Sequence, residues 1–164
     1  MKRAISFILV FILFSIFMVA ARSYASEPAI DFTLNDISGK AVTLSQFKNK
    51  QPVILIFWTI WCPFCREQLG VLKEKYAQLK QDGVEVFAVD VGEKQAKVES
   101  FVKDRNFPFR VLLDESAGIS KSYEVYGVPT YVFIDKTGAI ALKNNQFPDY
   151  KAVFGIKNPP QNGK

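Results

Sequence analysis

The chain of 164 residues holds two cysteines, Cys62 and Cys65, and no histidine. The Cys-x-x-Cys spacing sets the two thiols one helical turn apart, close enough to form a disulfide with each other. A disulfide across so short a loop constrains the unfolded chain little, so it would be a poor structural staple. A zinc site needs about four ligands, and a Cys-x-x-Cys pair supplies half of them. The spacing therefore favours a redox-active pair without a metal or another cofactor.

The segments on either side of the cysteines predict a buried strand followed by a helix. Residues 53–57, Val-Ile-Leu-Ile-Phe, are apolar without alternation, as in a strand buried on both faces. From Glu67 onward apolar residues recur at helical spacing, and Gly83 offers a stop. Cys62 therefore lies where a helix begins, and the unpaired N–H groups and helix dipole there favour an anion. Cys62 is the expected nucleophilic thiolate, and Cys65 is the expected resolving thiol.

The residues beside the pair bear on its chemistry and its surface. Pro63 fits the first helical turn, where its missing N–H would lack a partner in any case. Pro63 and Phe64 bring no cation that would stabilise a thiolate, which argues against a strongly oxidising protein. Trp61 and Phe64 could form an apolar docking surface together with Trp58, although Trp58 fits the core equally well.

The N-terminal segment has the pattern of an export signal. Residues 1–3 are Met-Lys-Arg, residues 4–21 are apolar apart from serines, and Ser23-x-Ala25 offers a small-residue cleavage pattern. Residues 1–25 are therefore either a cleaved signal peptide or a membrane anchor, since about 18 apolar residues can span a bilayer. Both predict an exported protein, periplasmic or at the extracytoplasmic face of a bacterial membrane, where disulfides persist.

The rest of the chain predicts one domain. The 139 residues that follow position 25 suffice for a single core over residues 26–157, and residues 158–164 are expected to be a disordered tail. Three of the excess positive charges lie in the N-terminal segment, so the remainder carries a net charge of only +2. Without a Lys/Arg-rich block with interleaved aromatic residues, nucleic acid is not an expected partner. A monomer is expected.

Strand and helix patterns alternate along this domain. Two short alternating runs at 31–34 and 41–44 flank turn residues and predict a β-hairpin. Beyond the redox helix, strands are predicted at 84–90, 109–113, 131–135 and 140–142, with helices over 93–106, 116–126 and part of 148–156. Such alternation indicates the α/β class, with a parallel or mixed sheet covered on both sides.

Four segments in this order resemble the thioredoxin superfamily, and within it the exported thiol–disulfide oxidoreductases of the TlpA and ResA type (AhpC/TSA-Redoxin-type domains). They are Asp31-Phe32-Thr33-Leu34 with Leu44-Ser45-Gln46-Phe47; Trp58-x-x-Trp61-Cys62-x-x-Cys65; the strand and helix from 84 to 106; and Gly127-Val128-Pro129-Thr130 with Phe133-Ile134-Asp135. The resemblance implies a thioredoxin-like three-layer α/β/α fold with a central mixed sheet, an N-terminal β-hairpin and an inserted strand–helix.

The resemblance also implies an activity and a binding surface. Family members of this type reduce protein disulfides outside the cytoplasm, so a disulfide-bearing client such as apocytochrome c and a membrane thiol–disulfide carrier as electron donor are the implied partners. In the family the proline matching Pro129 is cis and lies against the cysteine pair, so the Val128 backbone could pair with an extended client segment. The implied substrate-binding residues are Trp61, Pro63, Phe64, Val128 and Pro129, beside the catalytic Cys62 and Cys65.

The chain departs from the family at both positions that usually handle the proton. Ile56 stands where thioredoxins have a buried aspartate, and Gln68 stands where the TlpA and ResA type usually has a glutamate. An amide cannot accept a proton near neutral pH, so deprotonation of Cys65 must depend on water, on the helix end or on another acid. Glu67 lies about 100° around the helix from Gln68 and is expected at the surface. The final helix, expected within residues 148–156, is also shorter than the family's final helix.

Three other functions remain open from the sequence. A disulfide-forming oxidase would use the same cycle in reverse, and reduction potential decides the direction. A peroxiredoxin-like peroxidase shares the fold and the Thr59-x-x-Cys62 spacing, but Leu55 stands where such a peroxidase has proline. A non-catalytic chaperone or assembly factor that merely retains the motif would function without either thiol.

Overall fold

The structure is a computed structural model and describes residues 27–157. Residues 1–26 and 158–164 lie outside the described part, and with them the predicted signal or anchor and the predicted tail. Within residues 27–157, no helix combines the length and the apolar character needed to cross a membrane.

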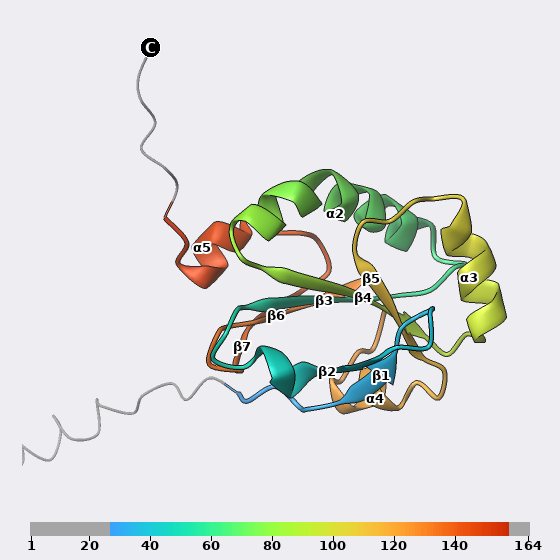
Figure 1. Cartoon of the computed structure of the whole chain (residues 1–164), viewed down its shortest axis with the longest axis horizontal. Coiled ribbons are helices and arrows are strands. Elements are labelled where there is room, and N and C mark those ends of the chain that lie inside the picture. Colours follow the sequence, from blue (N-terminus) through green and yellow to red (C-terminus); the bar gives the residue numbers. More distant parts are fainter. Residues whose placement is uncertain (1–26, 158–164) are drawn as a thin grey trace, which may run out of the picture.

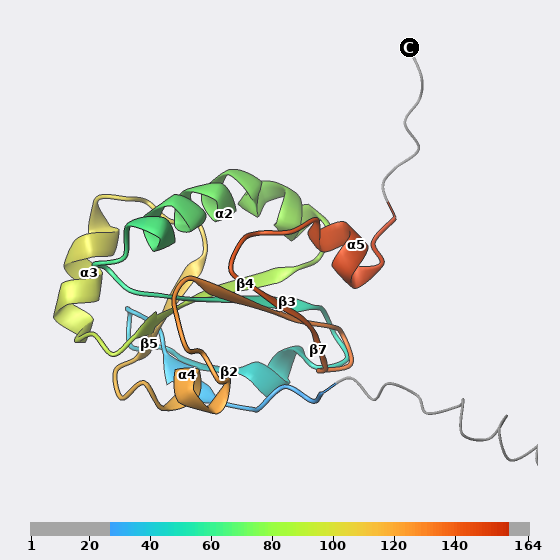
Figure 2. The ribbon, with the colours of Figure 1, turned by 180° about the vertical axis from the view of Figure 1, so that it is seen from behind.

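The core of the fold is a five-stranded sheet in the order β5-β4-β3-β6-β7, with β5 and β7 at opposite edges (Figures 1 and 2). The central strand β3 (Val53–Trp58) pairs in parallel with β4 (Glu85–Val91), which pairs in parallel with β5 (Arg110–Asp114). On its other side β3 pairs antiparallel with β6 (Thr130–Ile134), and β6 pairs antiparallel with β7 (Ile140–Asn144). The sheet is therefore mixed, as predicted.

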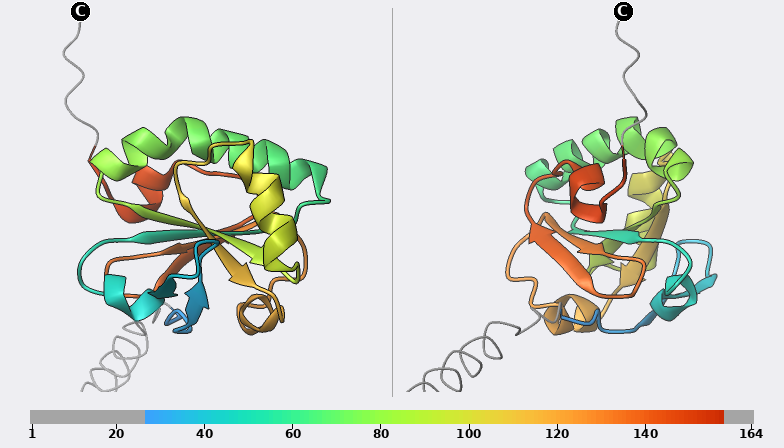
Figure 3. Two further views of the ribbon diagram at one scale, coloured as in Figure 1. Left: turned by 45° about the vertical axis from the view of Figure 1, so that its right-hand side comes forward. Right: turned by 90° about the vertical axis from the view of Figure 1, so that its left-hand side faces the viewer.

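Helices and a hairpin cover the two faces of this sheet, as Figures 1 and 3 show. One face carries α2 (Pro63–Gln81), α3 (Gln95–Lys103) and α5 (Tyr150–Phe154). The other face carries the hairpin β1 (Thr33–Asn35) and β2 (Ala41–Thr43), the 3₁₀ turn η1 (Leu44–Phe47) and α4 (Gly118–Ser122). Both covering layers confirm the predicted α/β/α arrangement with an N-terminal hairpin.

Each face of the sheet has its own apolar core, because alternate residues of a strand point to opposite sides. On the α2 face, Ile54, Ile56 and Trp58 of β3 belong to the same buried cluster as the leucines of α2. On the hairpin face, Leu55 and Phe57 of β3 pack in the cluster that contains Tyr123. All six residues of β3 are buried, which explains why its sequence is apolar without alternation. Each such side chain contributes about 1.5–3 kcal/mol of burial free energy.

Helix α4 is shorter than its sequence pattern predicts. The predicted helix over 116–126 is reduced to Gly118–Ser122, because Ala117 and Glu124 adopt left-handed backbone conformations (φ of 54° and 55°) that end the helix on both sides. Tyr123 lies inward and is buried, but Tyr126 is 93% exposed. The chain after α4 is therefore irregular as it approaches Pro129.

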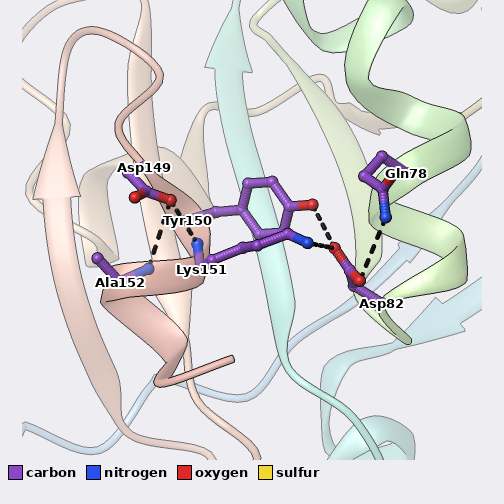
Figure 4. A network of polar contacts seen from close by, with 6 residues as sticks. All are labelled: Gln78, Asp82, Asp149, Tyr150, Lys151 and Ala152. Atoms are coloured by element: carbon purple, nitrogen blue, oxygen red, sulfur yellow. Dashed lines mark hydrogen bonds and ion pairs between the residues drawn. The ribbon is translucent and has the colours of Figure 1, made fainter. Parts of the chain in front are cut away.

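A polar network holds the short final helix against the end of α2 (Figure 4). The Asp82 carboxylate accepts a hydrogen bond from the Tyr150 hydroxyl and forms an ion pair with Lys151 Nζ at 3.0 Å. Gln78 donates to the same carboxylate at 3.3 Å. Asp149 caps the helix by accepting from the backbone N–H of Lys151 at 3.1 Å. Because helix α5 is short, these polar contacts are needed to hold it in place.

Candidate active site

The two cysteines lie where β3 gives way to α2, as the sequence predicts. Cys62 is the N-cap residue of α2, and its Sγ accepts a hydrogen bond from the backbone N–H of Cys65 at 3.2 Å. Pro63 opens the helix, where its missing N–H costs no hydrogen bond. The thiols are free rather than joined. This geometry allows Cys62 to react with a partner and Cys65 to approach it from the next turn.

The surroundings treat the two thiols differently. Cys62 is 4% exposed and Cys65 is completely buried. Burial, followed by the hydrogen bond with Cys62, raises the pKa of Cys65 to about 12, while a backbone hydrogen bond from Thr59 acts in the opposite direction. Cys65 is therefore held as a neutral thiol, which suits a resolving residue that reacts only after Cys62 has formed a mixed disulfide.

A groove runs beside the pair and contains part of the expected substrate-binding surface. The Cys62 thiol donates to the Val128 carbonyl at 3.6 Å, and the Val128–Pro129 peptide bond is cis, as the family resemblance implies. The groove has a volume of about 410 Å³ and is lined by Phe64, Glu67, Gln68, Gly127, Val128, Pro129, Asn145 and Gln146. Trp61 and Pro63 are exposed beside Cys62 but do not line it.

The aromatic residues near the pair divide between surface and core. Trp61 and Phe64 are each 70% exposed, so both are accessible to a partner. Trp58 is completely buried and packs against Phe101 of α3, with ring centroids 5.4 Å apart. Of the three aromatic residues considered for docking, Trp58 therefore belongs to the core.

Gln68 serves as a hydrogen-bond bridge. Its side-chain carbonyl accepts from the backbone N–H of Phe147 at 3.2 Å and from the Tyr131 hydroxyl at 3.4 Å. The same hydroxyl lies 3.2 Å from the Gln68 backbone carbonyl. Burial, together with the nearby Cys65, raises the pKa of Tyr131, so this hydroxyl stays protonated. The sequence singled out Gln68 but not Tyr131, because nothing in the chain order places β6 beside α2.

No carboxylate stands at either usual position, but one lies buried on the neighbouring strand. Ile56 points into the apolar core, and Glu67 is exposed, both as expected. Asp90 of β4 pairs in register with Trp58 and is completely buried. Burial, then the nearby Glu93 carboxyl, raises the pKa of Asp90 to about 8. The available sequence signal was a single acid at the end of the apolar run 84–90.

Curated proteins similar to this chain include thiol-disulfide oxidoreductases named ResA. Thiol-disulfide oxidoreductase ResA of Bacillus thuringiensis is 38% identical over 114 residues, which are 70% of this chain and 65% of the relative. ResA of Bacillus subtilis is 36% identical over 112 residues, 68% of this chain and 62% of the relative. The chain therefore spans slightly less than two thirds of the length of these relatives.

Solved structures of related proteins share the fold, with sequence identities of 26% and 28% in two examples. StoA from Bacillus subtilis superposes with a TM-score of 0.65 at 26% identity, covering 77% of this chain and 97% of StoA. A secreted disulfide oxidoreductase of Mycobacterium tuberculosis, described as homologous to E. coli DsbE, superposes with a TM-score of 0.62 at 28% identity, covering 72% and 84%. The AhpC/TSA family matches residues 25–143. With its thioredoxin-like fold, the chain belongs to the AhpC/TSA family.

Proposed function

We propose that this protein is an extracytoplasmic thiol–disulfide oxidoreductase that reduces disulfides of client proteins through a Cys62/Cys65 cycle. The observation that carries the proposal is the position of Cys62, which caps α2 and lies 3.6 Å from the carbonyl of Val128, a residue that lines the groove. A thiolate there meets the positive end of a 19-residue helix, and an extended client can lie along the groove.

The first step of the cycle forms a mixed disulfide. The Cys62 thiolate attacks one sulfur of the client disulfide, the new S–S bond forms, and the other client sulfur leaves as a thiolate that takes up a proton. Phe64, Val128 and Pro129 hold the client segment beside Cys62, and the exposed Trp61 and Pro63 extend the contact surface.

The second step releases the client. Cys65 loses its proton and attacks the Cys62 sulfur, which forms the Cys62–Cys65 disulfide and expels the second client sulfur as a thiol. The client gains two electrons and two protons, and the protein is left oxidised. Reduction by a membrane thiol–disulfide carrier would restore both thiols. Within this scheme the protein acts as a monomer without a cofactor.

Three observations support the reducing direction and the exported location. The residues between the cysteines, Pro63 and Phe64, carry no cation to stabilise a thiolate. The relatives include proteins named ResA and a secreted disulfide oxidoreductase. Residues 1–25 have the composition of a signal peptide or anchor. Apocytochrome c, whose haem-attachment motif also contains a Cys-x-x-Cys, is a client of suitable chemistry.

Trapping of the mixed disulfide tests this function. The reduced full-length protein is mixed with oxidised apocytochrome c or, as a general disulfide substrate, oxidised insulin. Wild type should reduce the probe, Cys65→Ser should remain covalently linked to it through Cys62, and Cys62→Ser should form no adduct. Adducts are read on non-reducing gels. Unchanged probe reduction by Cys62→Ser would contradict the proposal.

The same preparations separate the alternatives. Turnover of hydrogen peroxide by the wild type at a rate above that of probe reduction would support a peroxidase. Oxidation of reduced insulin in preference to reduction of its disulfides would support an oxidase. If the double variant Cys62→Ser/Cys65→Ser prevents client aggregation as well as the wild type does, the result would support a chaperone.

A further inference from the structure

A buried acid with little hydrogen bonding lies next to the turn that carries the cysteines. Asp90 is completely buried at the end of β4, and among the described residues neither of its carboxyl oxygens has a hydrogen-bond partner of good geometry. The backbone N–H of Glu93 lowers its pKa, but burial and the Glu93 carboxyl outweigh that effect. Asp114, on the adjacent β5, is almost as buried but accepts from the backbone N–H groups of Ile119 and Ser120. The contrast identifies Asp90 as an acid that the fold accommodates in its protonated form.

The acid that faces Asp90 is Glu93, and Glu93 holds the redox turn. Its Oε2 accepts a hydrogen bond from the backbone N–H of Ile60 at 2.7 Å, a short distance for such a bond. On the other side of the same residue, Arg66 Nη1 donates to the Ile60 carbonyl at 3.1 Å. Ile60 is therefore held at both ends by charged side chains, and we call this arrangement the Ile60 clamp.

The clamp adjoins the backbone group that stabilises the resolving sulfur. The peptide N–H of Thr59, next to the clamped residue, hydrogen-bonds Cys65 and lowers its pKa against the effect of burial. Two consecutive N–H groups of one turn thus serve Cys65 and Glu93. A shift of the turn that breaks one contact must disturb the other, because the two groups belong to adjacent peptide units.

The other charged groups near the pair are already engaged. Lys94 forms an ion pair with Glu115 at 3.0 Å, and Arg66 is bound to the Ile60 carbonyl. Asp114 adds a negative charge that, with Glu93, disfavours ionisation of Asp90. Helix α3 begins at Gln95, whose backbone N–H is bonded to Glu115. Among residues 27–157, Glu93 is therefore the acid with the largest effect on Asp90, and a proton on Asp90 can be donated to it.

We propose that Asp90 and Glu93 form a proton-sensitive positioning pair for the redox turn, acting on Cys65 through the Ile60 clamp. With a proton on Asp90, the Glu93 carboxylate holds Ile60 and the turn keeps the Thr59 N–H on Cys65. When that proton is lost, a second negative charge appears beside Glu93 and disfavours the Cys65 thiolate. The inference rests on the thiol chemistry of the proposed function but not on its direction or its client.

The proton itself is measured first, on the wild-type protein. Full-length reduced protein labelled with ¹³C-aspartate is followed by infrared spectroscopy from pH 5 to pH 10. We expect the carbonyl band of one protonated aspartate at pH 6, lost with a midpoint near the pKa of about 8 that burial gives Asp90. Absence of that band at pH 6 would overturn the proposal, and this readout requires no variant to fold.

The effect on the thiol is measured by thiolate absorbance against pH. In Asp90→Asn, no second charge can form, so Cys65 should ionise about one pH unit lower, a tenfold change in thiolate fraction at fixed pH. Glu93→Gln keeps an acceptor for Ile60 and should shift the curve in the same direction. Glu99→Gln, an exposed carboxylate of α3, is the matched control and should leave the curve unchanged.

The outcomes separate this inference from the proposed function. If the thiolate titration curves of the wild type, Asp90→Asn and Glu93→Gln coincide, and circular dichroism shows that all three are folded, the positioning role is overturned. Failure of the wild type to reduce any client would not affect these titrations, because they involve no client. A merely structural role for Asp90 would change the melting temperature without moving the thiolate curve.

Discussion

Cys65 is the residue whose ionisation limits the proposed cycle. It is completely buried, it carries a raised pKa of about 12, and neither usual carboxylate stands near it to take its proton. Within the described residues, a backbone hydrogen bond from Thr59 and the positive charge of Arg66 act in the opposite direction and lower this pKa. Release of the client should therefore be the pH-sensitive step.

The rate of client release should rise with pH. Because the raised pKa keeps Cys65 protonated through the neutral range, its thiolate fraction should increase about tenfold per pH unit between pH 5 and pH 7, where Asp90 still holds its proton. A chromophoric thiol attached to Cys62 as a mixed disulfide reports the release rate by stopped flow. A rate that stays flat over this range would show that another group removes the proton.

Tyr131 should contribute to stability through its hydroxyl. Tyr131→Phe removes the donor to Gln68 but leaves the Phe147 contact with that side chain in place. We expect a loss of about 1 kcal/mol of unfolding free energy, measured in urea. Tyr126→Phe, at a residue that is 93% exposed, is the control and should be neutral. Equal losses in both variants would contradict this role.

At the residue scale, the sequence predicted what spacing can reveal. Cys62 and Cys65 were found because a strand, a Cys-x-x-Cys and a helix follow one another in the chain. The roles of Asp90 and Tyr131 could not be predicted from the sequence, because their proximity to the redox turn depends on which strands pair and in what register. Gln68 was recognised as a departure, but its role as a bridge required the position of Phe147.

At the scale of the elements, the short helix α5 relies on the side chain of Asp82. It spans only Tyr150–Phe154, and Asp82 accepts from Tyr150 and pairs with Lys151 (Figure 4). An isolated helix of this length is not stable in water, so these contacts and its buried aromatic residue hold it in place. The C-terminal cover of the sheet thus depends on Asp82.

Asp82→Asn should destabilise the protein in a pH-dependent way. The hydrogen bond from Tyr150 and the contacts with Lys151 lower the pKa of Asp82, so its contribution is present above the unfolded pKa of about 4 and is lost as pH falls below it. We expect the variant to lose about 1 kcal/mol at pH 7, since solvent screens part of the interaction, and progressively less as pH falls below about 4, measured by denaturant unfolding. Glu74→Gln, exposed on α2, is the control. A difference that persists undiminished at pH 2.5 would contradict the assignment.

The sequence located the elements well and their ends less well. The predicted strands and the long helix match the structure to within a few residues, because their apolar periodicity is determined by burial. The helix over 116–126 was predicted too long, because Ala117 and Glu124 adopt positive φ without being glycine. Residues of this type give no warning of a left-handed conformation.

At the scale of the whole molecule, Asp90 should link global stability to pH. Its raised pKa means that the folded state binds a proton that the unfolded state releases between about pH 4 and pH 8, so stability falls as pH rises through this window. Asp90→Asn should remove this loss, gaining up to about 1.4 kcal/mol relative to wild type per pH unit. Unfolding free energies at pH 5, 7 and 8.5 test this, with exposed Asp104→Asn as control. A difference independent of pH would contradict it.

The overall architecture was predicted in part from periodicity and in part from resemblance. Alternating strands and helices indicated a covered α/β sheet, but the antiparallel addition of β6 to β3 does not follow from the chain order. The four family-like segments supplied that topology and the cis bond before Pro129. The faces of the sheet then place the redox turn, the groove and the buried acid at one end of β3.

The reduction potential of the Cys62–Cys65 pair tests the account most directly. The full-length protein is equilibrated with glutathione and dithiothreitol buffers of defined potential, and its free thiols are counted. We expect a value near or below that of thioredoxin, about −270 mV, as a reductase of protein disulfides requires. A value near the oxidising extreme of about −120 mV, or a pair that does not cycle, would contradict the proposed function.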